Sequence, residues 1–232
     1  MKRIDFEGVD GAGKTTLMAA FMQELRDLGA TVLGMRAMGT PQVELCGVLR
    51  DMVVGGAHGG TSSHEVRQLL CLAMEKENER YREEVRYQYD VCVSDRGYYS
   101  RLVYGERDVP WVTRDMLSSL GVTPPHMVVF CDAAVDVVEA RRGGRGTTDV
   151  VESRGNDYLY EIQRRFRDVL GASYAMPEAR GAERESRRTA FEPGVEVCTI
   201  STGAPIGESL RAARLLAGEV WETLPASKEV RP

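Results

Sequence analysis

Short apolar runs alternate with longer segments of helical periodicity along most of the chain. The apolar runs have the length and residue types of buried β-strands, and they fall at residues 3–7, 31–36, 91–95, 126–131 and 196–201. The helical patterns fall at residues 14–28, about 41–54, 63–89, 114–120, 134–141, 158–174 and 206–222. Apolar strands joined by helical crossovers predict an α/β fold, in which helices cover both faces of a parallel sheet.

Three stretches interrupt this order of strands and helices. Residues 55–62 are rich in glycine and predict a mobile loop, and residues 143–155 are rich in arginine and glycine and predict a flexible segment. Residues 177–193 carry many charges and predict a solvated insertion or a short surface helix. Neither a repeat nor a linker divides the chain, so we expect one domain at residues 1–224 and a flexible tail at 225–232.

A phosphate-binding loop is predicted at residues 8–15, which read GVDGAGKT between the first predicted strand and the first predicted helix. In this context the pattern G-x-x-x-x-G-K-T binds nucleotide phosphates. Its glycines let backbone N–H groups converge on an anion, and the helix N-terminus adds further unpaired N–H groups. Lys14 is expected to reach the β- and γ-phosphates, and the Thr15 hydroxyl to bind Mg²⁺. The residues expected to bind the phosphates of ATP are Asp10, Gly11, Ala12, Gly13, Lys14, Thr15 and Thr16.

Further charged residues fall at the carboxyl ends of the predicted strands, where ligands of a parallel sheet bind. Asp95 ends the third predicted strand, and Arg96 follows it. An arginine there is able to hold a monophosphate through two parallel hydrogen bonds, and Arg36 and Arg50 are candidates to converge on the same group. Asp95 is a candidate to assist Mg²⁺ through water or to orient Arg96. The alternative for Asp95 and Arg96 is a charged pair at a strand end on the surface.

The composition limits the class of protein. Hydrophobic residues make up 43% of the 232 residues and charged residues 28%, as in an ordinary soluble globular protein. The formal net charge of −5 argues against a nucleic-acid scaffold. No apolar run approaches the about 20 residues that span a bilayer, and the chain enters its first strand without a signal peptide. These observations predict a cytoplasmic protein with no membrane partner.

The motifs around the phosphate loop and after the third strand resemble those of the thymidylate kinase family. The first motif is FEGVDGAGKTT at residues 6–16, and the second is Asp95-Arg96 followed by Ser100 and Tyr104. A Pro-Pro pair at 124–125, Glu-Ala-Arg at 139–141 and an arginine-bearing lid at about 142–156 follow in the same order, so the resemblance covers residues 2–170. It implies the P-loop nucleoside monophosphate kinase fold, with a five-stranded parallel sheet, a mobile lid and a homodimer.

The resemblance also implies roles for single residues. It places the acceptor phosphate on Arg96, with Arg36 or Arg50 beside it. It pairs Asp10 with the 3′-hydroxyl of a deoxyribose and packs Tyr104 against the sugar. From the sequence alone, the alternative interpretations are that Asp10 is a solvated loop aspartate and that Tyr104 is a core tyrosine.

A lid arginine is expected to move onto the transferring phosphoryl group, where it stabilises charge and excludes water. The lid offers Arg141, Arg142, Arg145 and Arg154, of which Arg145 and Arg141 are the first choices. The phosphoryl donor is expected to be ATP with Mg²⁺, held by Thr15 and Asp95. The expected catalytic residues are Lys14, Asp95, Arg96, Arg141 and Arg145.

The chain departs from the family where the acceptor base is expected. The family's Leu-Leu-Phe-x-Ala-Asp-Arg stacks its aromatic ring on thymine and bonds a carbonyl through its arginine. Here residues 69–75 read Leu-Leu-Cys-Leu-Ala-Met-Glu, so Cys71 takes the aromatic position and Glu75 the arginine position. A slipped alignment, in which Lys76 or Arg80 replaces the arginine, is the alternative.

Two further departures lie next to Arg96. Gly97 replaces an aromatic residue or histidine, and Arg101 stands where the family often has a small polar residue that reads the base. Glu75 would accept a hydrogen bond from an amino or hydroxyl group, so we expect a base other than plain thymine: a cytosine, a purine or a 5-substituted pyrimidine. The residues expected to bind the acceptor are Asp10, Arg36, Arg50, Cys71, Glu75, Arg96, Ser100, Arg101 and Tyr104.

These observations together predict a (deoxy)nucleoside monophosphate kinase that transfers the γ-phosphoryl group of ATP. A GTPase is excluded, because the guanine-reading sequence Asn-Lys-x-Asp does not occur. A deoxynucleoside kinase and a kinase of a modified base within DNA stay open as alternatives. A nucleotide-binding regulatory protein is the non-enzymatic alternative.

Overall fold

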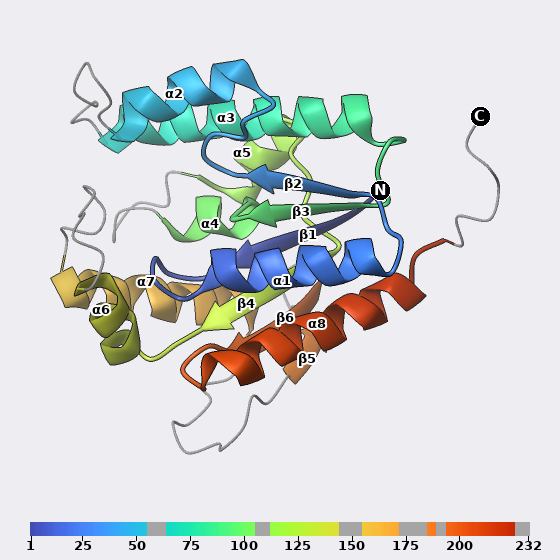
Figure 1. Cartoon of the computed structure of the whole chain (residues 1–232). Helices are drawn as coiled ribbons and strands as arrows, with labels where there is room; N and C mark the ends of the chain where they lie inside the picture. The colour runs from blue at the N-terminus through green and yellow to red at the C-terminus, as the bar shows by residue number, and fades with distance from the viewer. Residues whose placement is uncertain (55–63, 105–111, 144–154, 172–184, 189–193, 226–232) are drawn as a thin grey trace.

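The computed structural model describes residues 1–54, 64–104, 112–143, 155–171, 185–188 and 194–225 (Figure 1). Its centre is a six-stranded sheet in the order β2-β3-β1-β4-β6-β5. The strands are β1 (Lys2–Glu7), β2 (Val32–Arg36), β3 (Val91–Asp95), β4 (Met127–Asp132), β5 (Glu185–Arg188) and β6 (Glu196–Ser201). All neighbouring pairs are parallel except β5 and β6, which are antiparallel. The five-stranded parallel sheet expected from the sequence is therefore confirmed.

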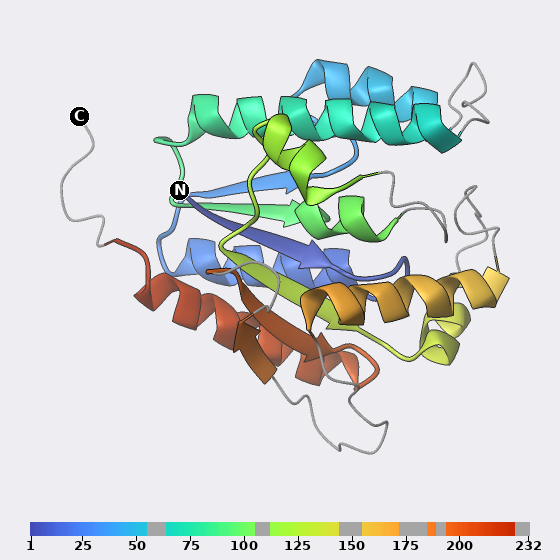
Figure 2. The same ribbon diagram turned by 180° about the vertical axis from the view of Figure 1, so that it is seen from behind.

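Helices cover both faces of this sheet (Figures 1 and 2). Helices α1 and α8 pack on each other over one face, whereas α4 and α7 pack on each other over the opposite face. Helix α2 packs on α3 at the β2 edge of the sheet. The helices are α1 (Lys14–Asp27), α2 (Glu44–Val54), α3 (His64–Val85), α4 (Tyr98–Val103), α5 (Arg114–Ser119), α6 (Val135–Gly143), α7 (Gly155–Leu170) and α8 (Ile206–Glu222).

The sixth strand corrects the expectation for the charged segment. Residues 177–193 were expected as a solvated insertion or a short helix, but β5 pairs Glu185 with Thr199 and Arg188 with Glu196 along the edge of β6. Pairing to an existing strand edge satisfies backbone hydrogen bonds, and this gain outweighs the low strand propensity of charged residues. The remaining residues of that segment lie outside the described ranges.

The other differences concern helices. The short helix α4, of six residues, was not expected. Helix α7 begins at Gly155 and ends at Leu170, so it is displaced toward the N-terminus from the expected 158–174. The lid expected at 142–156 is described only at its two ends, and the expected tail only at residue 225. In the described part of the chain, no helix combines the length and the apolar character needed to cross a membrane.

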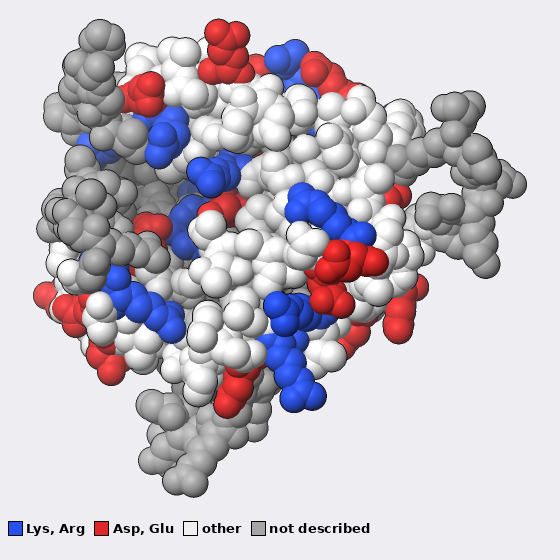
Figure 3. Space-filling model, in the orientation of Figure 1, with Lys and Arg blue, Asp and Glu red and all other residues white. Residues whose placement is uncertain are grey.

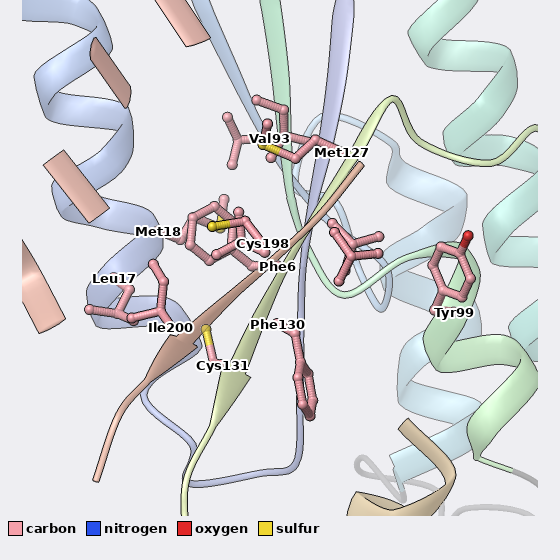
Figure 4. Close-up of a cluster of buried hydrophobic side chains, with 14 of the residues drawn as sticks. Phe6, Leu17, Met18, Val93, Tyr99, Met127, Phe130, Cys131, Cys198 and Ile200 are labelled. Atoms are coloured by element: carbon pink, nitrogen blue, oxygen red, sulfur yellow. The ribbon is translucent and has the colours of Figure 1, made fainter. Parts of the chain in front are cut away.

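Strand β1 separates an apolar layer from a charged layer. Ile4 and Phe6 are fully buried in the main core, and the Phe6 ring meets the Phe21 ring of α1 edge to face at 5.4 Å between centroids. Figure 4 shows Phe6 near Met18 of the same helix. Because side chains alternate along a strand, Arg3, Asp5 and Glu7 point to the opposite face, and all three are buried as well.

Two of these residues, Arg3 and Asp5, belong to a buried ionic network with Glu75, Glu79 and Arg82 of α3 and Arg101 of α4. Arg3 donates to both oxygens of Asp5 at 3.0 and 2.9 Å, and it also meets Glu75 and Glu79. The network holds three arginines and three carboxylates, so its formal charges balance. Removing one member of such a network leaves an uncompensated buried charge, which is strongly destabilising.

Gly97 lies against this network, and the structure explains why no larger residue stands there. Its φ of −173° is accessible to any residue, but a Cβ atom would fall 2.0 Å from Oδ2 of Asp5. Gly97→Ala is therefore expected to lower the free energy of unfolding by about 1–3 kcal/mol through overpacking, measured by urea unfolding. Gly47→Ala in α2 is the matched control, because a Cβ there meets nothing within 4 Å. The control should be as stable as the parent or more stable, by up to about 1 kcal/mol. Equal stability of the Gly97 variant and the parent would contradict this packing argument.

Candidate active site

The candidate site lies at the carboxyl ends of the parallel strands, where the loop after β1 meets the loop after β3. The strand arrowheads in Figure 1 end on this side of the molecule. Figure 3 shows basic and acidic side chains close together around a hollow on the same side. The sequence predicted this edge of the sheet as the binding edge.

The phosphate loop joins β1 to α1 through glycines in unusual conformations. Gly8, Gly11 and Gly13 have φ angles of 138°, 89° and 86°, which L-residues rarely adopt. Gly8 also lacks room for a side chain, since a Cβ would fall 2.6 Å from the carbonyl oxygen of Cys131 at the end of β4. Lys14 follows as the first residue of α1, so the backbone N–H groups of the helix start face the loop.

The ammonium group of Lys14 is buried inside this loop. Its Nζ donates to the carbonyl oxygen of Val9 at 2.9 Å and lies 3.9 Å from Oδ1 of Asp10. Burial and the nearby Arg96 cation lower the pKa of Lys14, while Asp10 and Asp95 act in the opposite direction. A cation held in this way is positioned to meet the phosphates of a nucleotide bound to the loop.

Thr15 and Asp95 bring two oxygen ligands together at the start of α1. The hydroxyl of Thr15 donates to Oδ2 of Asp95 at 2.9 Å, and both residues stand beside the loop rather than in the core. A hydroxyl and a carboxylate are hard oxygen ligands of the kind that Mg²⁺ prefers. The donor set at this point therefore fits the magnesium site that the sequence predicted.

Arg96 links the loop after β3 to the phosphate loop. Its guanidinium donates to the carbonyl oxygen of Gly8 at 2.7 Å and to Oδ1 of Asp10 at 2.5 Å, and it lies 4.8 Å from the centre of the Tyr104 ring. Its backbone has a φ of 65°, a left-handed conformation that is uncommon outside glycine. Such local strain is typical of functional sites, where the surrounding contacts hold it in place.

Asp10 is the anionic partner of both site cations. Burial alone would raise the pKa of Asp10, but Arg96 and Lys14 outweigh that effect and lower the pKa to about 2. Asp10 is therefore ionised at neutral pH. The carboxylate of Asp10 pairs with the guanidinium of Arg96 and the ammonium of Lys14. Its negative charge reduces the repulsion between these two cations.

Glu7 holds the start of α4 next to Arg96. Its carboxylate accepts hydrogen bonds from the backbone N–H groups of Gly97 and Ser100 at 3.0 and 3.1 Å, and from the Ser100 hydroxyl. The same hydroxyl lies 3.4 Å from the guanidinium of Arg96. Burial, with the neighbouring Asp5, raises the pKa of Glu7 to about 7. Glu7 thus fixes the start of α4 and, through Ser100, the place of Arg96.

Glu7→Gln is expected to flatten the pH dependence of stability. The pKa of Glu7 rises from its ordinary 4.5 to about 7 on folding, so the folded state binds the extra proton. Glu7 therefore contributes stability below its unfolded pKa that is lost as the pH rises through 7. Glutamine resembles the protonated carboxyl and does not titrate. The melting temperature of the variant minus that of the parent should therefore increase as the pH rises from about 5 to about 8.

Glu83→Gln is the matched control for this measurement, because Glu83 is an exposed glutamate of α3. Its melting temperature should follow that of the parent throughout the pH range. A Glu7 variant that also followed the parent would show that Glu7 does not titrate between the two limits.

The lid arginines are described only in part. Arg141 donates to the carbonyl oxygen of Thr202 at 2.6 Å, and its NH1 atom lies 3.9 Å from the place of a Cβ on Gly13. Arg142 lies against Gly11. The structure thus brings Arg141 and Arg142 to the phosphate loop. Arg145 and Arg154 lie outside the described residues, and a catalytic role for any of these arginines stays a prediction.

The residues expected at the acceptor base fall into two groups. Ser100 and Tyr104 lie beside Arg96, and Arg101 is the neighbour of Ser100 on α4. Cys71 instead packs with Val43, Cys46 and Met74 between α2 and α3. Glu75 is fully buried in the ionic network, where its carboxylate already has arginine partners.

The remaining two acceptor candidates are exposed. Arg36 ends β2, and its backbone is tied to the Thr40 hydroxyl at 3.2 and 2.7 Å. Arg50 lies on α2 with its aliphatic part against Gly39. Both stand near the same turn after β2, and their role at the acceptor phosphate stays a prediction.

Sequence reasoning missed the supporting residues Glu7, Asp5 and Arg3. Their signal was present, because charged residues at every second position of a strand between two parallel neighbours need buried partners. Thr202, which accepts from Arg141, carried no signal, since it acts through its backbone carbonyl.

Comparison with known proteins agrees with this geometry. The family model described as "Thymidylate kinase" matches residues 6–187. A thymidylate kinase of Burkholderia vietnamiensis is 32% identical over 204 residues, covering 78% of this chain and 94% of the relative. A thymidylate kinase of Campylobacter curvus is 28% identical over 179 residues (72% and 84%), and a probable thymidylate kinase of Methanothermobacter thermautotrophicus is 29% identical over 201 residues (84% and 97%). The chain belongs to the thymidylate kinase family and is an ATP-dependent phosphotransferase.

Proposed function

We propose that this protein transfers the γ-phosphoryl group of ATP to the phosphate of a (deoxy)nucleoside monophosphate that is thymidylate-like or carries a modified or non-thymine base. The observation that supports this acceptor is the position of Arg96. Its guanidinium lies against the carbonyl of Gly8 and the carboxylate of Asp10, directly beyond the loop that holds Lys14. A second cation beside a phosphate loop suits a reaction between two phosphate groups, because phosphoryl transfer depends mainly on alignment and charge neutralisation.

On the donor side, the helix start and Lys14 bind the triphosphate. Lys14 exchanges the Val9 carbonyl for phosphate oxygens, which are stronger partners because they carry charge. The contact of Arg141 with Thr202, beside Gly13, supports a place for this arginine on the donor side. Residues 142–156 close over the reacting groups in this proposal, and Arg145 or Arg141 then stabilises the transferring phosphoryl group.

Mg²⁺ would be held by Thr15 directly and by Asp95, directly or through water. When bound, it would supply positive charge that neutralises part of the charge of the ATP phosphates. The protein's own contribution is the hydrogen bond from Thr15 to Asp95, which keeps both oxygen ligands on one side of the loop.

On the acceptor side, Arg96 holds the monophosphate and Asp10 binds the sugar. Arg96 uses Oδ1 of Asp10, and Asp10 stays ionised because its pKa is about 2. A carboxylate in that state is a strong acceptor for a sugar hydroxyl. The Tyr104 ring, which lies edge to face on Phe166 at 5.8 Å, offers a fixed apolar surface for the sugar.

The test is a coupled assay of ADP release with each common nucleoside and deoxynucleoside monophosphate, and with 5-substituted pyrimidine monophosphates. We expect ADP release that depends on a monophosphate and a diphosphate product. ADP release that depends instead on a nucleoside or on DNA would replace this proposal by one of the other kinase classes. Nucleotide binding without any turnover would favour a regulatory protein. If dTMP is clearly the best acceptor, the proposal of an altered base is wrong while the kinase assignment stands.

The same proposal includes a homodimer. Leu45, Val48 and Met52 are exposed apolar residues spaced along one side of α2, a surface that a second copy would cover. Light scattering is expected to give twice the mass of one chain, and Val48→Glu to reduce it. A cytoplasmic location and the absence of nucleic-acid and membrane partners stay predictions.

A further inference from the structure

We infer that Arg165 and Phe166 of α7 are positioning residues for the acceptor side, and that they act on Arg96 through Tyr104. Neither residue is expected to touch a nucleotide. The inference rests on the proposed function, and it adds to that function two residues that lie outside the motifs recognised in the sequence.

The guanidinium of Arg96 lies against one face at the end of α4. The backbone N–H of Tyr104 donates to the carbonyl oxygen of Ser100 at 3.0 Å, so these two residues are neighbours along that face. Arg96 contacts both of them: its NH1 donates to the Ser100 hydroxyl at 3.4 Å, and its guanidinium lies 4.8 Å from the centre of the Tyr104 ring. The place of the guanidinium therefore depends on the place of the ring.

Helix α4 is too short to hold this face by itself. It has six residues, whereas isolated helices shorter than about 12 residues are marginal in water. At its start, the Glu7 carboxylate accepts hydrogen bonds from the N–H groups of Gly97 and Ser100. The carbonyl groups at the end of a helix need partners as well. Those partners come from another element.

Helix α7 supplies them. Figure 2 shows α7 beside α4 on the same face of the sheet. NH1 of Arg165 donates to the carbonyl oxygen of Val103, the last residue of α4, at 3.3 Å. The ring of Phe166 meets the Tyr104 ring edge to face. Two consecutive residues of α7 thus hold two consecutive residues at the end of α4, one through a carbonyl group and the other through a ring.

The burial of Arg165 supports a role beyond a surface ion pair. Its side chain is 18% exposed, and its Nε donates to Glu161 at 2.9 Å. Arg164 pairs with the same glutamate, but its side chain is 53% exposed and also bonds Asp168. A guanidinium gives up hydration when it is buried, so hydrogen bonds must replace the lost water. The Val103 carbonyl is such a partner, and a cation beside the last carbonyl groups of a helix stabilises that helix end.

Helix α7 is itself anchored to the sheet, so it is a rigid support. Phe166 is fully buried, and its ring lies 5.9 Å from the ring of Phe130 in β4. One turn of β4 farther along the chain is not needed for a second anchor, because Arg167 donates to both oxygens of Asp132 at the end of the same strand, at 2.9 Å each. The Tyr104 ring is therefore connected to β4 through Phe166.

The experiment compares Arg165→Gln and Arg165→Lys with the parent. Initial rates are measured with dTMP, dCMP or dGMP, whichever the parent phosphorylates fastest. Arg165→Gln should raise the KM of this acceptor about 3- to 10-fold, as expected for one lost hydrogen bond, and leave the KM of ATP unchanged. Arg165→Lys should fall between the two, because it keeps a cation beside the Val103 carbonyl. Phe166→Leu should change the acceptor KM in the same direction, since leucine offers no ring to Tyr104.

Arg164→Gln is the matched control, because Arg164 is exposed and shares Glu161 with Arg165. It should leave both KM values unchanged. Tyr104→Leu removes the ring through which the effect passes, so Arg165→Gln should raise the acceptor KM no further in that background. A residue that only stabilises the fold would lower the melting temperature without separating the two KM values.

The outcomes separate this inference from the proposed function. If the parent phosphorylates no monophosphate, the proposed function fails, and this inference fails with it. If the parent is active but both Arg165 variants keep the parental acceptor KM, or raise the KM of ATP equally, only this inference is wrong. An equal rise in Arg164→Gln, or full additivity with Tyr104→Leu, would also contradict it. Should Arg165→Gln fail to fold, the acceptor KM of Arg165→Lys decides.

Discussion

Replacing Lys14 by methionine is expected to lower kcat by about a thousandfold, because it removes a preorganised cation from the transferring phosphates. The fold should survive, since methionine fills a similar volume and the variant no longer buries an ammonium group. Burial disfavours this charge, as the lowered pKa of Lys14 shows. Stopped assays at saturating ATP and acceptor measure the loss, and thermal unfolding without nucleotide should show equal or higher stability.

Lys2→Met is the matched control for this variant. Lys2 is at the opposite end of β1, where its ammonium donates to the Thr223 hydroxyl at 2.8 Å. Its kcat should equal that of the parent. A Lys14 variant with near-parental kcat would show that the loop binds nucleotide without using this cation in the reaction.

Replacing Arg96 by lysine is expected to lower kcat/KM for the acceptor at least about a hundredfold, with little effect on the KM of ATP. Lysine keeps the charge but loses the planar fork that binds two phosphate oxygens, and with it the separate donors that contact Gly8 and Asp10. Arginine and lysine have the same backbone strain at a φ of 65°, so strain does not confound the comparison. Initial rates over a matrix of ATP and acceptor concentrations separate the two sides.

Two further variants are compared with Arg96→Lys. Arg96→Gly removes the side chain and relieves the backbone, so it should be inactive while still folded. Arg80→Lys changes an exposed arginine of α3 that pairs at the surface with Glu77 and Glu84, and it should behave as the parent. Equal losses for ATP and for the acceptor in Arg96→Lys would contradict its assignment to the acceptor side.

The features that the sequence predicted best are those determined locally. The phosphate loop depends on glycines at fixed positions between a strand and a helix, and the apolar runs report strands buried on both faces. Helix α4 and strand β5 depended on distant contacts. Glu7 must hold the start of α4, and the edge of β6 must accept β5. Neither requirement is visible within a short window of residues.

The ionic network shows the same limit for the site. Glu75, Glu79 and Arg82 have the i, i+4, i+7 spacing of one helix face, and Arg3 and Asp5 share one strand face. Each pattern can be recognised in the sequence on its own. The ion pairs between the strand and the helix, however, join residues more than seventy positions apart. The sequence therefore predicted Glu75 as a residue of the base pocket, whereas in the structure its carboxylate forms ion pairs with arginines.

The two carbonyl groups that receive Lys14 and Arg96 belong to neighbouring residues, Val9 and Gly8. Each of the two cations is thus bonded to one of two consecutive peptide units. Gly8 is in turn pinned against the end of β4, where no side chain has room. Before nucleotide binds, this dipeptide therefore fixes the separation of the two cations, and a small displacement of the loop would carry both of them together.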